Sequence, residues 1–87
     1  MRMHLVEEVV PAAHEGRVAT VFVPLEEHLW GRFDRETVSV QVHAEYEPGD
    51  RDLLDVAALE TLLNGGAVYA IAPQELPAKP LAALLRF

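Results

Sequence analysis

The chain has 87 residues, of which 51% are hydrophobic and 24% charged, a composition typical of one globular domain rather than a disordered segment. It contains no cysteine, which excludes disulfide frameworks, thiolate metal sites and cysteine nucleophiles. The excess of acidic over basic residues gives a net charge of −7, which disfavours direct binding to nucleic acid. No stretch reaches the about 18 consecutive apolar residues of a membrane span, so we expect a cytoplasmic protein without membrane contact.

The chain is predicted to begin with a helix and a strand. The helix spans His4–Glu15, is kinked or begins late because of Pro11, and is capped by Gly16. The strand, Val18–Val23, is continuously apolar, which predicts a central strand covered on both faces. The apolar face of the helix is predicted to hold Leu5, Val9, Ala12 and Ala13.

A β-hairpin is predicted next, in "HLWGRFDRETVSVQVHAEYE", with its turn at Asp34–Glu36. Its second arm alternates between apolar and polar residues, which predicts one buried and one solvated face. The buried set is Val38, Val40, Val42, Ala44 and Tyr46, and the solvated set is Ser39, Gln41, His43 and Glu45.

A second helix is predicted at Leu53–Leu63, after the turn "EPGD". Either Asp50 or Asp52 is suited to cap its N-terminus. Asn64, Gly65 and Gly66 follow it and are expected to supply the positive φ angles that end a helix. The predicted apolar stripe of the helix is Val56, Leu59 and Leu63.

Two further strands complete the prediction, at Ala67–Ala72 and Leu81–Phe87. The first is expected to be covered on both faces and to run parallel to Val18–Val23. The second is expected to join the same sheet as a neighbour of Ala67–Ala72. The resulting fold class is an α/β sandwich of two or three layers with a mixed β-sheet, in a single domain over residues 1–87.

Few residues are suited to catalysis or metal binding. The four histidines have no compact spacing for a metal, and metal binding by His28 with Glu26 and Glu27 is disfavoured because neighbouring residues of an extended chain point apart. The only serine, Ser39, lies in a predicted strand without nearby glycines. The carboxylate pairs Asp34/Glu36 and Asp52/Asp55 fit turn and helix-start roles. We therefore predict no catalytic residue, no metal and no cofactor.

The stretch "LWGRF" is the best candidate for a binding surface. Trp and Arg are enriched in the residues that dominate protein interfaces, so His28, Trp30 and Arg32 are predicted to bind a partner. The alternative interpretation is a hairpin arm whose aromatic residues, Trp30 and Phe33, close the edge of the core.

The C-terminal segment "LLNGGAVYAIAPQELPAKPLAALLRF" resembles the end of the third domain of Pelota and of the archaeal and eukaryotic class-one release factors. In those domains a glycine pair precedes a covered strand, and a short connection leads to an Ala-Ala-aliphatic-aliphatic-Arg-aromatic strand. The matching positions here are Gly65 and Gly66, Ala67–Ala72, and the last six residues ending in Arg86 and Phe87.

The beginning of the chain resembles the same domain. "HEGRVATVFVPL" is similar to the Gly-x-Val-x-Thr-aliphatic start of its first strand, with Gly16, Val18 and Thr20 in place. The middle resembles the bacterial archaeo-eukaryotic release factor proteins, a branch of the same superfamily. Two features depart from Pelota: the loop Gln74–Pro80 is shorter, and a hairpin around Trp30 replaces a more helical region.

The resemblance implies an α/β sandwich related to the kink-turn-binding ribosomal proteins. It also implies a non-catalytic protein-interaction domain of a translation factor in ribosome rescue or hibernation, whose partner is a translational GTPase or the ribosome. Peptide release in that family needs a Gly-Gly-Gln loop in another domain, and no Gly-Gly-Gln occurs here. The resemblance does not indicate the oligomeric state, nor whether the chain is part of a longer factor.

Three alternatives remain on sequence grounds. The first is an RNA-binding domain that keeps the function of its ribosomal-protein relatives. The second is a small acidic adaptor that acts alone. The third is a small enzyme that uses His28 with a nearby carboxylate, for which the histidine must lie in a concave pocket.

Overall fold

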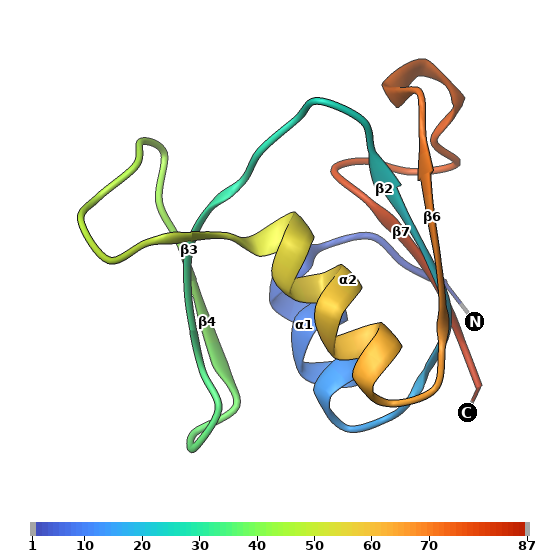
Figure 1. Ribbon diagram of the computed structural model, residues 1–87, viewed down its shortest axis with the longest axis horizontal. Coiled ribbons are helices and arrows are strands. Elements are labelled where there is room, and N and C mark those ends of the chain that lie inside the picture. Colours follow the sequence, from blue (N-terminus) through green and yellow to red (C-terminus); the bar gives the residue numbers. More distant parts are fainter. Residues whose placement is uncertain (1, 87) are drawn as a thin grey trace.

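Two helices lie between two β-sheets in the computed structural model, which describes residues 2–86 (Figure 1). One sheet has four strands and the other three, so the predicted α/β sandwich is confirmed in a three-layer form. Phe87, which the sequence assigns to the last strand, lies outside the described residues. The elements are β1 (Arg2–Met3), α1 (Val6–His14), β2 (Val18–Pro24), β3 (Trp30–Asp34), β4 (Ser39–Val42), β5 (Arg51–Asp52), α2 (Leu53–Leu63), β6 (Ala67–Ile71), the 3₁₀ turn η1 (Pro73–Glu75) and β7 (Ala82–Leu85).

The four-stranded sheet has the strand order β1-β7-β2-β6. The predicted parallel pairing is confirmed, because β2 runs parallel to β6 with Val21 opposite Val68. The last strand joins this sheet as predicted, but the expectation that it neighbours β6 is wrong: β7 pairs antiparallel with β2 and with β1. This interior position buries Ala82 and Ala83, at 2% and 0% exposure, which the outer edge of β6 would not do.

Hydrogen bonds hold the end of the chain in place as far as it is described. The backbone N–H of Arg86 donates to the carbonyl of Arg17 at 2.7 Å, and its guanidinium donates to the carbonyl of Asn64 at 3.3 Å. The tail is therefore tied to the start of β2 and to the end of α2.

The predicted hairpin is formed by β3 and β4, but it belongs to a separate sheet of order β4-β3-β5. The prediction of one sheet containing all strands is therefore wrong. The predicted alternation is correct only at the start of β4, where Val40 packs against the core while Ser39 and Gln41 are exposed. It is wrong further along, because Val42 and Ala44 are exposed whereas the side chain of His43 is only 19% exposed. Val38 departs from it, because it lies in the turn with a φ of 54° and not in the strand.

The two helices supply most of the buried core residues, and they lie between the two sheets (Figure 1). Residues of β2 and Ala83 of β7 join this core from the large sheet, and Phe33 and Val40 pack against it from the small sheet. Leu53 at the start of α2 and Leu81 before β7 are both 0% exposed. Asp52 caps α2 by accepting the backbone N–H of Leu54 at 3.0 Å, which decides between the two predicted caps. None of the helices within residues 2–86 is long and apolar enough to cross a bilayer.

The predicted apolar stripes of both helices are partly wrong. On α2, Val56 is buried but Leu59 and Leu63 are 38% and 62% exposed, because the inner face carries Glu60 and Thr61 instead. On α1, Leu5 is the cap residue before the first turn and is 43% exposed. The residues of α1 that are buried are Val6, Val9, Val10, Ala12 and Ala13.

The glycines after the helices have different roles. Gly16 and Gly65 have φ angles of 77° and 84°, which is the conformation expected where a helix ends. Asn64, with a φ of −107°, and Gly66 are not among the residues with positive φ, so the sequence interpretation of both is wrong. A Cβ there would lie 2.6 Å from Cγ2 of Thr61 and 2.7 Å from the carbonyl oxygen of Val18, so Gly66 lets α2 approach β2 closely.

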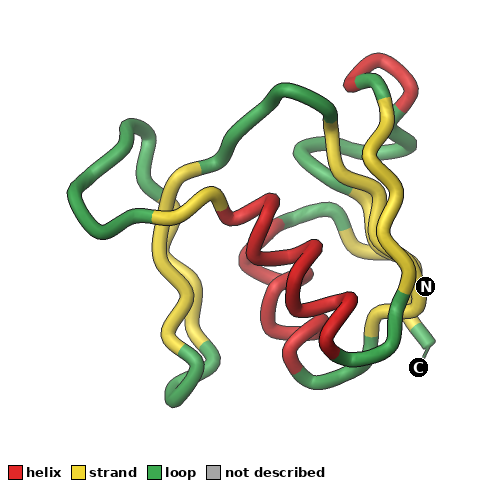
Figure 2. Tube along the Cα trace, viewed as in Figure 1, coloured by secondary structure: helices red, strands yellow, loops and turns green. Residues whose placement is uncertain are grey.

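The outer face of the large sheet has no helix over it within residues 2–86 (Figure 2). The prediction that β2 and β6 are covered on both faces is therefore wrong. On this outer face Phe22 stacks on Tyr69, with ring centroids 5.6 Å apart, and Tyr69 and Leu84 are 54% and 40% exposed. The continuous apolar character of these strands thus produces an open apolar face instead of a second buried one.

Candidate docking surface

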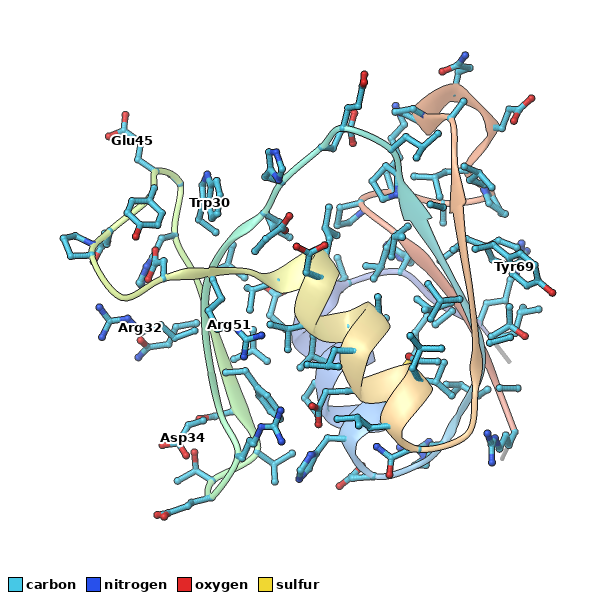
Figure 3. The ribbon with its side chains drawn as sticks, in the orientation of Figure 1. Trp30, Arg32, Asp34, Glu45, Arg51 and Tyr69 are labelled. Carbon is cyan, nitrogen blue, oxygen red and sulfur yellow. The ribbon has the colours of Figure 1, made fainter. Side chains whose placement is uncertain are left out.

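Three aromatic side chains form a row at one end of the small sheet. The imidazole of His28 stacks on the indole of Trp30, with centroids 5.3 Å apart and ring planes 16° apart. The ring of Tyr46 contacts the indole of Trp30 edge-on, with centroids 5.2 Å apart and ring planes 86° apart. We call His28, Trp30 and Tyr46 the aromatic row. Figure 3 places Trp30 on the side of the molecule opposite Tyr69.

The His28 side of the row is fixed by the cap of α2. Nδ1 of His28 is 2.8 Å from Oδ2 of Asp52, and Oδ1 of Asp52 accepts the backbone N–H of Leu29 at 3.1 Å. The Asp52 side chain is 9% exposed, whereas that of His28 is 59% exposed. The same carboxylate therefore caps the helix and orients an exposed imidazole beside Trp30.

The Tyr46 side of the row is fixed by Asp50, whose side chain is 0% exposed. Its Oδ2 lies 2.8 Å from Nδ1 of His43 and accepts the backbone N–H of Glu47 at 3.0 Å. Its Oδ1 accepts Nε of Arg32 at 3.2 Å. One buried carboxylate thus closes the loop that carries Tyr46, residues 43–50, and sets that loop against β3.

The environment of Asp50 favours its ionised form. Burial alone raises the pKa of this carboxyl, but the hydrogen bonds from His43, from the Glu47 backbone and from Arg32, together with the charge of His43, outweigh burial and lower the pKa below the usual 3.8. Because the folded state lowers this pKa, the ionised carboxylate stabilises the fold above about pH 3.8, and that stabilisation is lost as the pH falls below this value.

We expect this contribution to be measurable in acid. The free energy of unfolding of the wild type, measured by urea denaturation, is expected to fall below about pH 3.8, and to fall less steeply in Asp50→Asn, which has no carboxyl to protonate there. Asp55→Asn, at an exposed position of α2, is the matched control and is expected to follow the wild-type slope. Equal slopes for Asp50→Asn and the wild type would contradict the assignment.

Arg32, the third predicted binding residue, does not join the aromatic row. Its guanidinium donates to Asp50 at 3.2 Å and to the carbonyl of Pro48 at 2.8 Å, so it holds the loop that carries Tyr46. Its side chain is still 52% exposed. It also borders a hollow of about 190 Å³ on the outer face of the hairpin, lined by Arg32, Asp34, Ser39 and Gln41.

Sequence reasoning missed two residues of this surface. Tyr46 was assigned to the buried face of a strand, but it lies in the loop after β4 and its side chain is 55% exposed. Asp50 was considered only as a helix cap. The available signal was the segment "EPGD", because the carboxylate of an aspartate in a turn can accept hydrogen bonds from backbone N–H groups near it in the sequence.

A second buried carboxylate, Glu60, joins the helices to the hairpin. Its side chain is 1% exposed, and Oε1 lies 2.7 Å from Nδ1 of His14 on α1. Its other oxygen, Oε2, accepts Nη2 of Arg35 at 2.7 Å, from the turn between β3 and β4. Glu60 therefore connects three segments that lie far apart in the sequence.

The structure does not bring together the groups that hydrolysis or metal binding would need within residues 2–86. The hydroxyl of Ser39 is 2.6 Å from that of Thr37 in the hairpin turn. Within residues 2–86 no three His, Asp or Glu side chains are grouped so that they could hold a metal ion. A hollow of about 490 Å³ beyond the end of β2 is lined by Leu25, Glu26, Glu27, Ala72 and Pro73, and His28 does not line it.

Comparisons with known proteins give no assignment. No protein-family model matches the sequence, and no curated protein matches it significantly. The geometry of the surface therefore has to carry the functional argument.

Proposed function

We propose that the protein is a non-catalytic protein-interaction domain of a bacterial translation factor related to Pelota and the release factors. In this proposal it acts in the cytoplasm, docks a translational GTPase or the ribosome, and uses the aromatic row as the centre of the contact. The observation that carries the proposal is the exposed stack of His28, Trp30 and Tyr46, held from beneath by two carboxylates.

The rigidity of the row supports a binding role. Trp and Tyr provide large contact areas with few rotatable bonds, and interfaces concentrate their binding energy in such residues. Asp50 and Asp52 fix the backbone on both sides of the stack before any partner arrives. Since ordering side chains and loops on association costs free energy, a surface that is already ordered binds more tightly.

The relation to the Pelota family rests on the two motifs at the ends of the chain. They meet in space, because Val18 and Thr20 of the first motif pair with Leu85 and Leu84 of the last. A pair of motifs that forms neighbouring strands of one sheet is consistent with a shared fold, although each motif alone is short.

The test is co-sedimentation with purified bacterial ribosomes, with and without a translational GTPase. We expect the wild type to be retained and Tyr46→Ala to bind at least about fivefold more weakly, since removing an interface aromatic residue typically costs 1 kcal/mol or more. Tyr69→Ala is the matched control, because Tyr69 is 54% exposed and Tyr46 is 55% exposed.

Three outcomes would count against the proposal. One is that the wild type binds neither the ribosome nor the GTPase. Another is that Tyr46→Ala and Tyr69→Ala weaken binding equally. The third is that the domain binds protein-free ribosomal RNA in a gel shift as well as it binds ribosomes, which would favour the RNA-binding alternative over protein docking.

A further inference from the structure

The exposed charges around the aromatic row are acidic. Glu45 and Glu47 flank Tyr46 on its loop, and both are exposed. Glu26 and Glu27 precede His28, and both are exposed as well. Figure 3 places Glu45 near Trp30, at the same end of the small sheet.

One of these carboxylates has a neighbour on its own loop, because Oε2 of Glu47 lies 3.6 Å from Nδ1 of His43. The nearby arginines do not offset the carboxylates. The guanidinium of Arg32 is bonded to Asp50, so its charge is neutralised within the loop. Arg51 is the register partner of Gly31, whereas Trp30 pairs with Asp52. Because successive side chains of a strand alternate between faces, the side chain of Arg51 leaves the sheet on the face opposite Trp30.

We propose that the aromatic row recognises a basic segment of its protein partner, with Arg or Lys side chains placed against Tyr46 and between Glu45 and Glu47. This inference rests on the proposed docking function and names the chemistry of the partner. The argument is charge complementarity: an ordered aromatic surface with a rim of exposed carboxylates fits a segment that brings positive charge.

Tyrosine and carboxylate groups suit this role together. A guanidinium or ammonium group over an aromatic ring is attracted by the ring's negative face, and the attraction grows as the pair is desolvated. Glutamates on either side of the same ring accept the N–H groups that the ring leaves free. Arginine is favoured over lysine, because its planar group can stack on Tyr46 and bond a carboxylate at once.

The site has a built-in reporter, because Trp30 is the only tryptophan of the chain. Its fluorescence can be followed while an Arg-rich peptide that lacks Trp and Tyr is added to the intact protein. We expect saturable binding to the Arg-rich peptide, weaker binding to a Lys-rich one, and none to the same peptide with Gln in place of Arg. The affinity is expected to fall as salt is raised from about 50 to about 200 mM.

A matched pair of double variants separates the site from the net charge. Glu45→Gln/Glu47→Gln is expected to weaken peptide binding about fivefold or more. Glu7→Gln/Glu8→Gln removes the same two charges from exposed positions on α1 and is expected to leave the affinity nearly unchanged. Equal weakening in both variants would mean attraction to a negatively charged protein in general, and would overturn the inference.

The peptide and ribosome experiments fail independently. Retention on ribosomes or the GTPase without any binding of the Arg-rich peptide would overturn the basic-partner inference and leave the docking function standing. Saturable peptide binding that depends on Glu45 and Glu47 would support the inference, even if the ribosome and the GTPase prove to be the wrong partners. Binding of the Gln peptide as tightly as the Arg peptide would also overturn it.

Discussion

Replacing Gly31 with alanine is expected to destabilise the protein by about 3 kcal/mol or more. A Cβ at this position would overlap the backbone carbonyl oxygen of Gln41 and lie 2.6 Å from Cδ1 of Leu53. The first of these atoms belongs to the neighbouring strand and the second to a residue that is 0% exposed, so neither can move without disturbing β4 or the core. Urea denaturation of Gly31→Ala beside the wild type measures the loss directly.

Gly16→Ala is the control for this substitution. Gly16 has a φ of 77° but nothing within 4 Å of a Cβ, so its replacement is expected to cost only about 1 kcal/mol from backbone strain. If Gly31→Ala were no less stable than Gly16→Ala, the close contact between β3, β4 and α2 would be wrong. The change in Trp30 fluorescence on unfolding is measured in the same experiment. A smaller change in Gly31→Ala than in the wild type would show that the substitution also disturbs the aromatic row.

Replacing Glu60 with alanine is expected to cost about 2–4 kcal/mol. The substitution removes a side chain that is 1% exposed and deprives both His14 and Arg35 of their partner. The side chains of His14 and Arg35 are 31% and 50% exposed, so they can turn toward water, which keeps the expected loss below that of a fully buried ion pair. The free energy of unfolding at neutral pH is the measurement.

Two further variants make the Glu60 prediction specific. Asp55→Ala removes an exposed carboxylate from the same helix and is expected to change stability by at most about 0.5 kcal/mol. Arg35→Ala is expected to cost measurably in the wild-type background and nearly nothing in the Glu60→Ala background, because the bond it makes is already gone. Additive losses in the double variant would contradict the contact between the hairpin turn and α2.

The elements that the sequence predicted well are those with local signals. The bounds of α2 are the predicted Leu53–Leu63, since an aspartate cap precedes it and Asn-Gly ends it. The hairpin was placed correctly to within two residues: its predicted turn was Asp34–Glu36, whereas Asp34 ends β3 and the turn spans residues 35–38. What failed was the assignment of partners: which sheet the hairpin joins and which strand β7 pairs with depend on contacts between segments distant in the sequence.

Buried polar groups explain the error on α2. Hydrophobic periodicity assigned Leu59 and Leu63 to the core, yet the structure turns Glu60 inward and leaves those leucines exposed. A glutamate is accommodated there only because His14 and Arg35 meet it, and neither residue is near it in the sequence. No pattern within the helix itself contains that information.

Two of the three residues of the aromatic row were predicted from the sequence, and the third was not. His28 and Trp30 are two residues apart in an extended segment, so their side chains share a face and can stack, and both were predicted to bind a partner. Tyr46 joins them only because Asp50 folds the loop 43–50 back onto β3, through bonds to His43 and Arg32. That closure joins two segments, the loop and β3, and could not be predicted from either one alone.

The open face of the large sheet has a consequence for how the protein behaves in solution. Phe22, Tyr69 and Leu84 make that face apolar, with the exposed Arg2 of β1 opposite Leu84, on a molecule whose net charge is −7. We expect electrostatic repulsion between molecules to oppose association through these faces, and to be weakest near the isoelectric point of about 4.9. The protein should therefore be least soluble in mildly acidic buffer, at a pH where its fold is still intact.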